Sequence, residues 1–209
     1  MSALTVTPSD VPLTSKRWFR ITAVVEVEVR IRVGNMADVP AVLALYDRAV
    51  EWLVASGRSG QWGSDPWSEK PKSIARVQRF AGSGEMRVAE YEGDLVGAMR
   101  LGAAPQSIPS VEEPDLFLEA LVIDRRVAGL GVGKALMDRA RDEARERGIS
   151  LLRVQCWAGG DQGLVRYYER AGFVQTGQIK SAAFGGWEGA ILSQRLERSE
   201  SKAGCGAKD

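Results

Sequence analysis

The spacing of apolar and polar residues predicts a chain in which strands and helices alternate. Apolar and charged side chains alternate from Val25 to Val33, which is typical of a half-buried strand, and the latter part should be the first strand of the domain. Apolar residues recur at helical spacing over 39–53, after Asp38 and Pro40. A short helix over 73–80 and a hairpin made of 86–91 and 95–101 follow.

The second half continues this alternation. Residues 116–123 form an apolar run of strand length, and apolar side chains at helical spacing over 132–144 predict a helix that Gly148 ends. Residues 151–157 predict a strand dense in apolar side chains. Asp161 should cap a helix over 162–171, and strands over 173–179 and 187–196 complete the order β-α-α-β-β-β-α-β-α-β-β. The order predicts a mixed α/β (α+β) domain.

The predicted elements also divide the chain. The 209 residues allow one good-sized domain with appendages. We expect an N-terminal extension over 1–28, partly disordered or adding an extra strand, a domain over 29–196, and a polar tail over 197–209. An arm that packs on a neighbouring subunit is the alternative interpretation of the first twenty residues.

Composition narrows the classes of function. The formal net charge of +1 provides no strong field for nucleic acid or an anionic membrane, and no apolar run approaches the ~20 residues that span a bilayer. The N-terminus lacks the pattern of a secretion signal, and Cys156 and Cys205 make a poor disulfide framework, so a cytoplasmic location is expected. The absence of histidine excludes a Ser-His-Asp triad, a Cys-His pair and a His-ligated zinc site.

A glycine-rich segment lies between the strand over 116–123 and the helix that follows it. Glycine allows positive φ and close approach of the backbone to a ligand, and the first turn of a helix presents unpaired N–H groups. Together they predict a site for a phosphate or pyrophosphate. The expected contacts are Ala128, Gly129, Leu130, Gly131, Val132, Gly133 and Lys134.

Two common phosphate motifs do not match this segment. A P-loop needs glycine where Ala128 stands and a hydroxyl where Ala135 stands. A dinucleotide fingerprint needs its third glycine where Lys134 or Leu136 stands, depending on the register.

The segment instead resembles the acetyl-CoA loop of the GCN5-related N-acetyltransferases (GNAT), usually Gln/Arg-x-x-Gly-x-Gly/Ala. It departs at the first position, where this chain has Ala128. Tyr168 to Phe173 resembles the family's Tyr-x-x-x-Gly-Phe, and Glu119 to Ile123 resembles the strand before the loop. The resemblance covers roughly 29–196. It implies the acyl-CoA N-acyltransferase fold, a central, largely antiparallel mixed sheet flanked by helices, with acetyl-CoA as co-substrate and no metal.

The resemblance also implies roles for single residues. The strand over 116–123 should splay from the strand over 151–157, so that the backbone of Leu121, Val122 and Ile123 pairs with the pantetheine arm and stabilises an oxyanion. Tyr168 is the candidate general acid and a cofactor contact, with a core tyrosine as the alternative; Tyr167 is the weaker candidate. Asp161 is a further expected cofactor contact.

Charged and aromatic residues suggest the acceptor side of the site. Glu119 is a carboxylate inside an apolar strand and is the candidate general base, with a solvent-facing carboxylate as the alternative. Glu112, Glu113 and Asp115 could serve instead. Trp62, Trp67 and Trp187 either line an acceptor pocket or close an edge of the core.

The function expected from the resemblance is transfer of the acetyl group of acetyl-CoA to a primary amine of a small molecule, by direct attack in a ternary complex. A non-catalytic acyl-CoA-binding sensor or assembly module is the alternative, and a nucleotide-binding protein is a third. No nucleic acid or membrane partner is expected. The long first strand and N-terminal arm would suit a homodimer.

Overall fold

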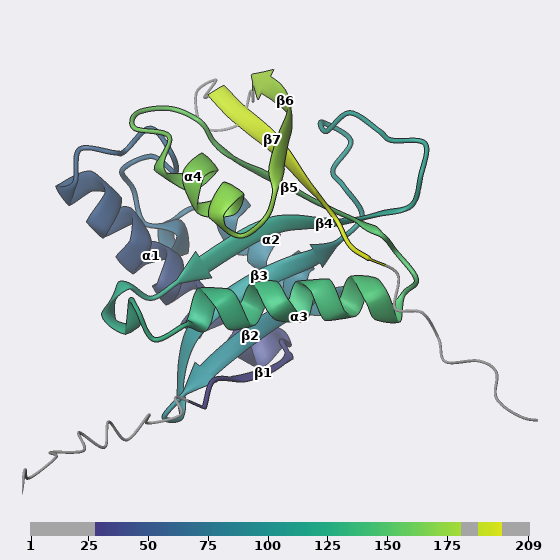
Figure 1. Ribbon diagram of the computed structural model, residues 1–209. Coiled ribbons are helices and arrows are strands. Elements are labelled where there is room, and N and C mark those ends of the chain that lie inside the picture. The colour runs from purple at the N-terminus through teal and green to yellow at the C-terminus, as the bar shows by residue number, and fades with distance from the viewer. Residues whose placement is uncertain (1–27, 181–187, 198–209) are drawn as a thin grey trace, which may run out of the picture.

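The computed structural model describes residues 28–180 and 188–197. Within these residues, seven strands form one sheet in the order β1-β2-β3-β4-β5-β7-β6 (Figure 1). The strands are β1 (Arg30–Val33), β2 (Met86–Tyr91), β3 (Asp94–Gly102), β4 (Asp115–Ile123), β5 (Leu151–Trp157), β6 (Val174–Lys180) and β7 (Glu188–Arg195). The parallel neighbours among these described strands are β4 and β5; the other pairs are antiparallel.

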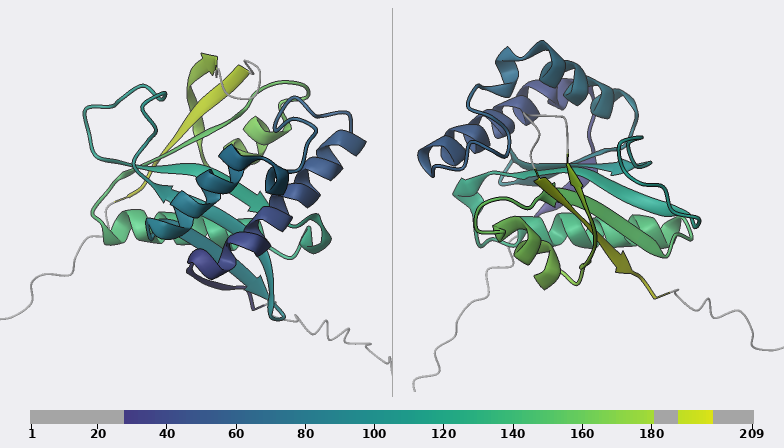
Figure 2. Two further views of the ribbon diagram at one scale, coloured as in Figure 1. Left: turned by 180° about the vertical axis from the view of Figure 1, so that it is seen from behind. Right: turned by 90° about the horizontal axis from the view of Figure 1, so that it is seen from above.

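Helices cover both faces of the sheet (Figure 2). The helices are α1 (Val39–Ala55), α2 (Pro71–Gly82), α3 (Val132–Glu146) and α4 (Gly163–Arg170), with 3₁₀ turns η1 (Met36–Asp38), η2 (Trp67–Glu69) and η3 (Arg125–Val127). Helices α1 and α2 lie on one face, and α3 and α4 lie on the other. The model therefore has the mixed α/β architecture that the sequence predicts.

Each face of the sheet has its own apolar core. On one side Leu136 and Ala140 of α3 pack with Leu118 and Val154, and on the other Val42 of α1 packs in a cluster that also contains β2 and β3 residues. Fully burying one such aliphatic side chain contributes roughly 1.5–3 kcal/mol, so the amphipathic spacing that predicts the helices also fixes them to the sheet.

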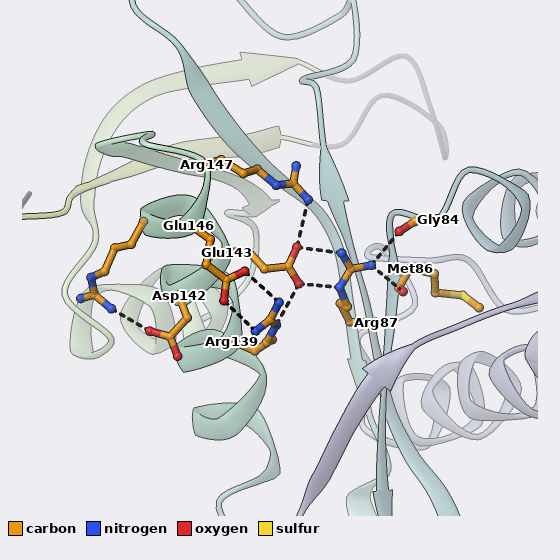
Figure 3. Close-up of polar contacts among 9 residues, drawn as sticks. Gly84, Met86, Arg87, Arg139, Asp142, Glu143, Glu146 and Arg147 are labelled. Atoms are coloured by element: carbon orange, nitrogen blue, oxygen red, sulfur yellow. Dashed lines mark hydrogen bonds and ion pairs between the residues drawn. The ribbon is translucent and has the colours of Figure 1, made fainter. Parts of the chain in front are cut away.

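A buried ionic network fastens the C-terminal half of α3 to β2 (Figure 3). The Glu143 carboxylate accepts hydrogen bonds from Arg87, from Arg139 at 3.0 Å and from Arg147 at 3.0 Å, and its side chain is 2 % exposed. Burial opposes ionisation of Glu143, but the hydrogen bonds and charges of Arg87 and Arg139 outweigh it and lower its pKa. The charge is thereby retained inside the protein.

Within the described residues the predicted elements are confirmed, with differences at their ends; residues 25–27 of the predicted first strand lie outside them. Helix α2 begins at Pro71 rather than 73, and α4 begins at Gly163 rather than 162. Asp161 is not the N-cap residue of α4: Gln162 holds that position with φ 54°, and the Asp161 carboxylate accepts a hydrogen bond from the Gly163 N–H at 3.1 Å. Trp187, predicted to begin the last strand, lies outside the described residues.

No helix in the described part of the chain combines the length and the apolar character needed to cross a membrane.

Candidate active site

The glycine-rich segment adopts the backbone that a phosphate site needs. Gly129 and Gly131 have φ of 87° and 79°, and Gly131 is the N-cap residue of α3. In this left-handed region a residue with a side chain is strained by about 1–2 kcal/mol, whereas glycine is not. No described residue accepts a hydrogen bond from the backbone N–H groups at the start of the helix. These free N–H groups belong to Gly129, Gly131, Val132, Gly133 and Lys134.

The side chains around this segment leave its backbone accessible. A Cβ at Gly129 or Gly131 would have nothing within 4 Å, whereas one at Gly133 would lie 2.6 Å from the Tyr167 hydroxyl. The Lys134 side chain is exposed and its Nζ bonds Asp138 at 2.6 Å, one turn further along α3. The anion-binding capacity of the segment is therefore mainly a property of its backbone.

Strands β4 and β5 separate beside this segment. Their parallel pairing runs from Asp115 with Leu151 to Leu118 with Val154 and then stops, although β4 continues to Ile123 and β5 to Trp157. On its other edge β4 stays paired with β3 as far as Ile123. The edge of β4 that faced β5 is thus unpaired beyond Leu118 among the described strands, as the splay expected from the resemblance requires.

A cavity of about 340 Å³ opens where the two strands separate. Its walls come from β4 and β5, from α1, α2, η2 and α4, from the segment before η2 and from the loop between β3 and β4. Of the residues singled out in the sequence, those that line it are Trp62, Trp67, Glu119, Leu121, Cys156 and Tyr168. Val122 and Ile123 do not line the cavity and pack into the cores on opposite faces of the sheet.

A bulge in β4 turns Glu119 toward the cavity. Leu118 pairs with Leu101 and Ala120 pairs with Arg100, which leaves Glu119 as an extra residue between them. The bulge shifts the alternation of the strand by one residue: Leu118 and Leu121 both pack on the side of α3 and α4. Glu119 is therefore freed from the regular pleat at the point where β4 leaves β5.

Two arginines bind the Glu119 carboxylate. Nη2 of Arg76, from α2, lies 3.1 Å from Oε1, and Nη1 of Arg100, from β3, lies 2.6 Å from Oε2. The Glu119 side chain is 12 % exposed. A carboxylate has about four lone-pair positions, so these two contacts leave positions that can accept a proton or a hydrogen bond from the cavity.

Tyr168 lies at the α4 end of the cavity. Its ring makes edge contacts with Tyr167 and Phe173, at centroid distances of 5.2 Å and 5.7 Å. Burial raises the pKa of the Tyr168 phenol well above its ordinary value of 10.0, so it is a neutral hydrogen-bond donor at neutral pH. Both interpretations from the sequence apply, since Tyr168 belongs to the core and lines the cavity.

Cys156 of β5 lines the same cavity. Burial, with a smaller effect from the charge of Glu169, raises the pKa of the Cys156 thiol to about 12. The thiol therefore stays protonated, which makes Cys156 a poor nucleophile. It also indicates that the surroundings of the cavity disfavour a thiolate.

Three aromatic rings form another wall of the cavity. Tyr46 of α1 lies parallel to Trp67 with ring centroids 4.0 Å apart, and Trp62 meets Tyr46 edge-on at 5.3 Å. Trp67 is 2 % exposed. The two uses foreseen for these tryptophans coincide, because the rings close an edge of the core and line the cavity.

Asp161 and the alternative bases are not part of the cavity lining. The Asp161 carboxylate pairs with Arg58 at 3.0 Å. Among the alternative bases, Glu113 pairs with Arg195 and Asp115 pairs with Arg153. None of these residues, nor Glu112, lines the cavity.

Sequence reasoning missed several residues of the cavity, among them Tyr46, Arg76 and Arg79. Tyr46 reads as one more apolar position of α1, and Arg76 and Arg79 read as the polar face of a short helix. Arg76 and Arg79 are three residues apart, which places them on the same face of α2. The local signal in the sequence is a pair of cationic residues at this spacing, close along the chain to two tryptophans. The signal is weak, because helices commonly carry such pairs on solvated faces.

Comparison with known proteins agrees with this geometry. Residues 45–173, more than half of the chain, match the model of the acetyltransferase (GNAT) family. The chain belongs to this family, and its fold is the acyltransferase fold of that family. No curated protein sequence matches the chain significantly.

Solved structures of the same fold align over most of the chain. One is a GNAT-family acetyltransferase from Listeria monocytogenes, 21 % identical, covering 81 % of this chain and 96 % of its own, with TM-score 0.59. Ribosomal-protein-alanine N-acetyltransferase from Brucella melitensis is 24 % identical, covering 80 % and 99 %, with TM-score 0.59. The yncA protein from Salmonella typhimurium, solved with its cofactor acetyl-CoA, is 18 % identical, covering 85 % and 99 %, with TM-score 0.57. At these identities the likeness establishes the fold.

Proposed function

We propose that this protein transfers the acetyl group of acetyl-CoA to a primary amine of a small molecule, by direct attack within a ternary complex. Family membership supports an acyltransferase. The observation that carries the finer proposal is the cavity at the separation of β4 and β5, directly before a helix start with free N–H groups. A cavity of about 340 Å³ is at the lower end of the size range of small-molecule sites.

Acetyl-CoA fits the groups that line this region. Its pyrophosphate would accept hydrogen bonds from the backbone of Gly129 to Lys134. Its pantetheine arm would add to the unpaired edge of β4 at Leu121, Val122 and Ile123, and its thioester would supply an activated acetyl group. N–H groups on that edge can stabilise charge on the carbonyl oxygen.

The reaction needs one proton removed and one supplied. The lone pair of the neutral amine forms the N–C bond, the C–S bond breaks with its electron pair on sulfur, nitrogen loses a proton, and sulfur gains one. We assign Glu119 to accept the proton of the amine through a water molecule, using the lone pairs that Arg76 and Arg100 leave free. No covalent enzyme intermediate is needed.

Tyr168 suits the leaving sulfur. In water a thiol (pKa about 8.5) is a stronger acid than a phenol (about 10), so a phenol would not readily protonate a thiolate. Burial in the cavity raises the pKa of both groups, that of the Tyr168 phenol well above 10.0 and that of the Cys156 thiol to about 12, so it makes a leaving thiolate more basic without reversing this order. We therefore assign Tyr168 to donate a hydrogen bond to the leaving sulfur, along which its proton passes as the C–S bond breaks, and solvent then restores the proton of Tyr168.

A non-catalytic acyl-CoA-binding module is the competing proposal, since a bound cofactor alone would explain the glycine segment. The test is an assay of the full chain with acetyl-CoA and a broad panel of small amines, following released thiol and acetylated product together. We expect equal amounts of thiol and acetylamine. Binding of acetyl-CoA without acetylation of any amine would favour the sensor.

The cytoplasmic location and the homodimer remain predictions. Measuring the mass of the purified full chain in solution decides between monomer and dimer.

A further inference from the structure

We infer that the acceptor carries a carboxylate as well as its amine, beside an apolar body, as an apolar amino acid does. This inference rests on the proposed function and names the substrate class of that site. It concerns the part of the cavity that α2 and the aromatic rings line.

The charges that face the cavity favour an anion. Its charged lining residues among the described part of the chain are Arg76, Arg79 and Glu119, which is two cations against one anion. The Glu119 charge is further neutralised by Arg100, whose own second partner is Glu85 at 2.7 Å. The four residues Arg76, Glu119, Arg100 and Glu85 sum to zero, which leaves the charge of Arg79 uncompensated.

Arg76 is held in place with donors to spare. Its guanidinium lies 5.4 Å from the ring centroid of Phe80 and 5.9 Å from that of Trp67. Of its five N–H donors, one donates to Glu119, and its Nε is buried with no acceptor in the described structure. These two rings therefore hold the Arg76 guanidinium in place, and its contact with Glu119 uses only part of its hydrogen-bonding capacity.

Arg79 lies one turn further along α2. It lines the cavity, and no carboxylate of the described residues pairs with it. Side chains three residues apart on a helix are neighbours, so Arg76 and Arg79 can face one ligand group together. The planar fork of arginine matches a carboxylate, and such charge-assisted contacts are stronger than neutral ones.

The aromatic wall determines the rest of the ligand. Tyr46, Trp62 and Trp67 offer apolar ring surface beside the two arginines. A carboxylate on α2 and an apolar body against these rings would leave the amine to face Glu119 and the thioester. A cationic acceptor with no anionic group would instead meet the uncompensated charge of Arg79.

The test compares amines that differ only in the carboxylate. The probes are L-phenylalanine against phenethylamine and L-leucine against isopentylamine, assayed with acetyl-CoA and the full chain. The variants are Arg79→Gln and the control Lys72→Gln, which removes the same charge from an exposed position of α2 that does not line the cavity. For each amine, the ratio of kcat/KM between wild type and variant does not depend on the intrinsic basicity of that amine.

We expect kcat/KM to favour the carboxylated member of each pair at least tenfold. Arg79→Gln should lower kcat/KM for that member by about ten- to a hundredfold, mainly through KM, and leave the other member unchanged within about twofold. Arg79→Lys should restore part of the loss, and Lys72→Gln should have no effect.

Failures of the two proposals are distinguishable. Equal use of both members, or an unchanged preference in Arg79→Gln, overturns the carboxylate inference and leaves the acetyltransferase intact. If acetyl-CoA binds and no amine is acetylated, the proposed function fails, and thermal melts with CoA plus each probe decide the inference. A rise in Tm with the carboxylated probes alone, lost in Arg79→Gln, supports it, and no rise or an equal rise overturns it.

Discussion

Tyr168 and Cys156 share one environment, and that environment sets the proton chemistry of the cavity. Burial raises the pKa of both side chains, to about 12 for the thiol. A neutral phenol in a site that disfavours a thiolate can donate a hydrogen bond to the leaving sulfur and stabilise it as the C–S bond breaks. The proposed proton transfer to the leaving sulfur therefore depends on the Tyr168 hydroxyl.

Removing that hydroxyl tests its role. Tyr168→Phe keeps the ring that contacts Phe173, so we expect the free energy of unfolding to change by less than about 1 kcal/mol. We expect kcat to fall by about a hundredfold or more, the size of a general-acid contribution, with acetyl-CoA affinity unchanged. Steady-state kinetics and a binding titration measure both quantities.

Tyr91→Phe is the control. Tyr91 is a half-buried tyrosine of β2 that packs against the core and does not line the cavity. An unchanged kcat in Tyr168→Phe would contradict the proposed acid, and equal losses in both variants would point to a structural effect.

The Glu119 carboxylate supports a second prediction at this scale. Glu119→Gln keeps the shape of the side chain but cannot accept a proton, so kcat should fall by about a hundredfold or more. The result that would sink the proposed base is an unchanged kcat with a raised KM, because Glu119 would then only position Arg76.

The sequence indicates these residues unequally. The match to Tyr-x-x-x-Gly-Phe singles out Tyr168, and a lone charge in an apolar strand singles out Glu119. Arg76 could not be found in this way, because its contact with Glu119 joins residues 43 positions apart. Such a pairing depends on how α2 packs over the sheet, and no local pattern records it.

Among the elements, the turn from η3 into α3 carries the proposed pyrophosphate site. Gly131 has φ of 79° and open space around it, so an added methyl group costs backbone strain without a clash. Gly131→Ala should weaken acetyl-CoA binding about tenfold and lower the free energy of unfolding by about 1 kcal/mol. Calorimetric titration and urea unfolding give the two values.

Gly148 supplies the matched control at the other end of α3. It has φ of 68°, again with nothing within 4 Å of an added Cβ. Gly148→Ala should cost similar stability and leave acetyl-CoA binding unchanged. If the two variants weaken binding alike, the effect is general destabilisation and the site lies elsewhere.

The attachment of α3 to β2 gives another prediction. Glu143→Gln leaves Arg87 buried without its charge partner, so the free energy of unfolding should fall by about 3–5 kcal/mol. Asp142→Asn, which affects an exposed pair with Arg145, should change it by less than about 1 kcal/mol. Urea unfolding curves compare them, and equal small losses would contradict a structural role for the network.

The elements were predictable to different degrees. Helices and strands followed from apolar spacing, which depends only on local sequence. The bulge at Glu119 could not be predicted from apolar spacing. Its mark in the sequence is the three-residue step between Leu118 and Leu121, whose side chains pack on the same side of the sheet. Regular alternation would have placed those two side chains on opposite faces, and the tertiary packing of both on one side reveals the extra residue.

For the whole molecule, the order of elements and the fold class were predictable, and the cavity was not. The separation of β4 from β5 came from the resemblance alone, because nothing in 116–123 or 151–157 indicates where their pairing ends. The cavity also needs α1 and α2 above the sheet and α4 below it (Figure 2). That arrangement is set by packing among distant segments.

The most direct test of the central claim is a thermal melt of the full chain with acetyl-CoA, CoA, ATP-Mg and NAD in parallel. A ligand at a hundred times its dissociation constant should raise Tm by roughly 5–10 °C for a domain of this size. We predict that rise with acetyl-CoA and CoA and none with ATP-Mg or NAD. A rise with ATP-Mg or NAD and none with acetyl-CoA would contradict the account.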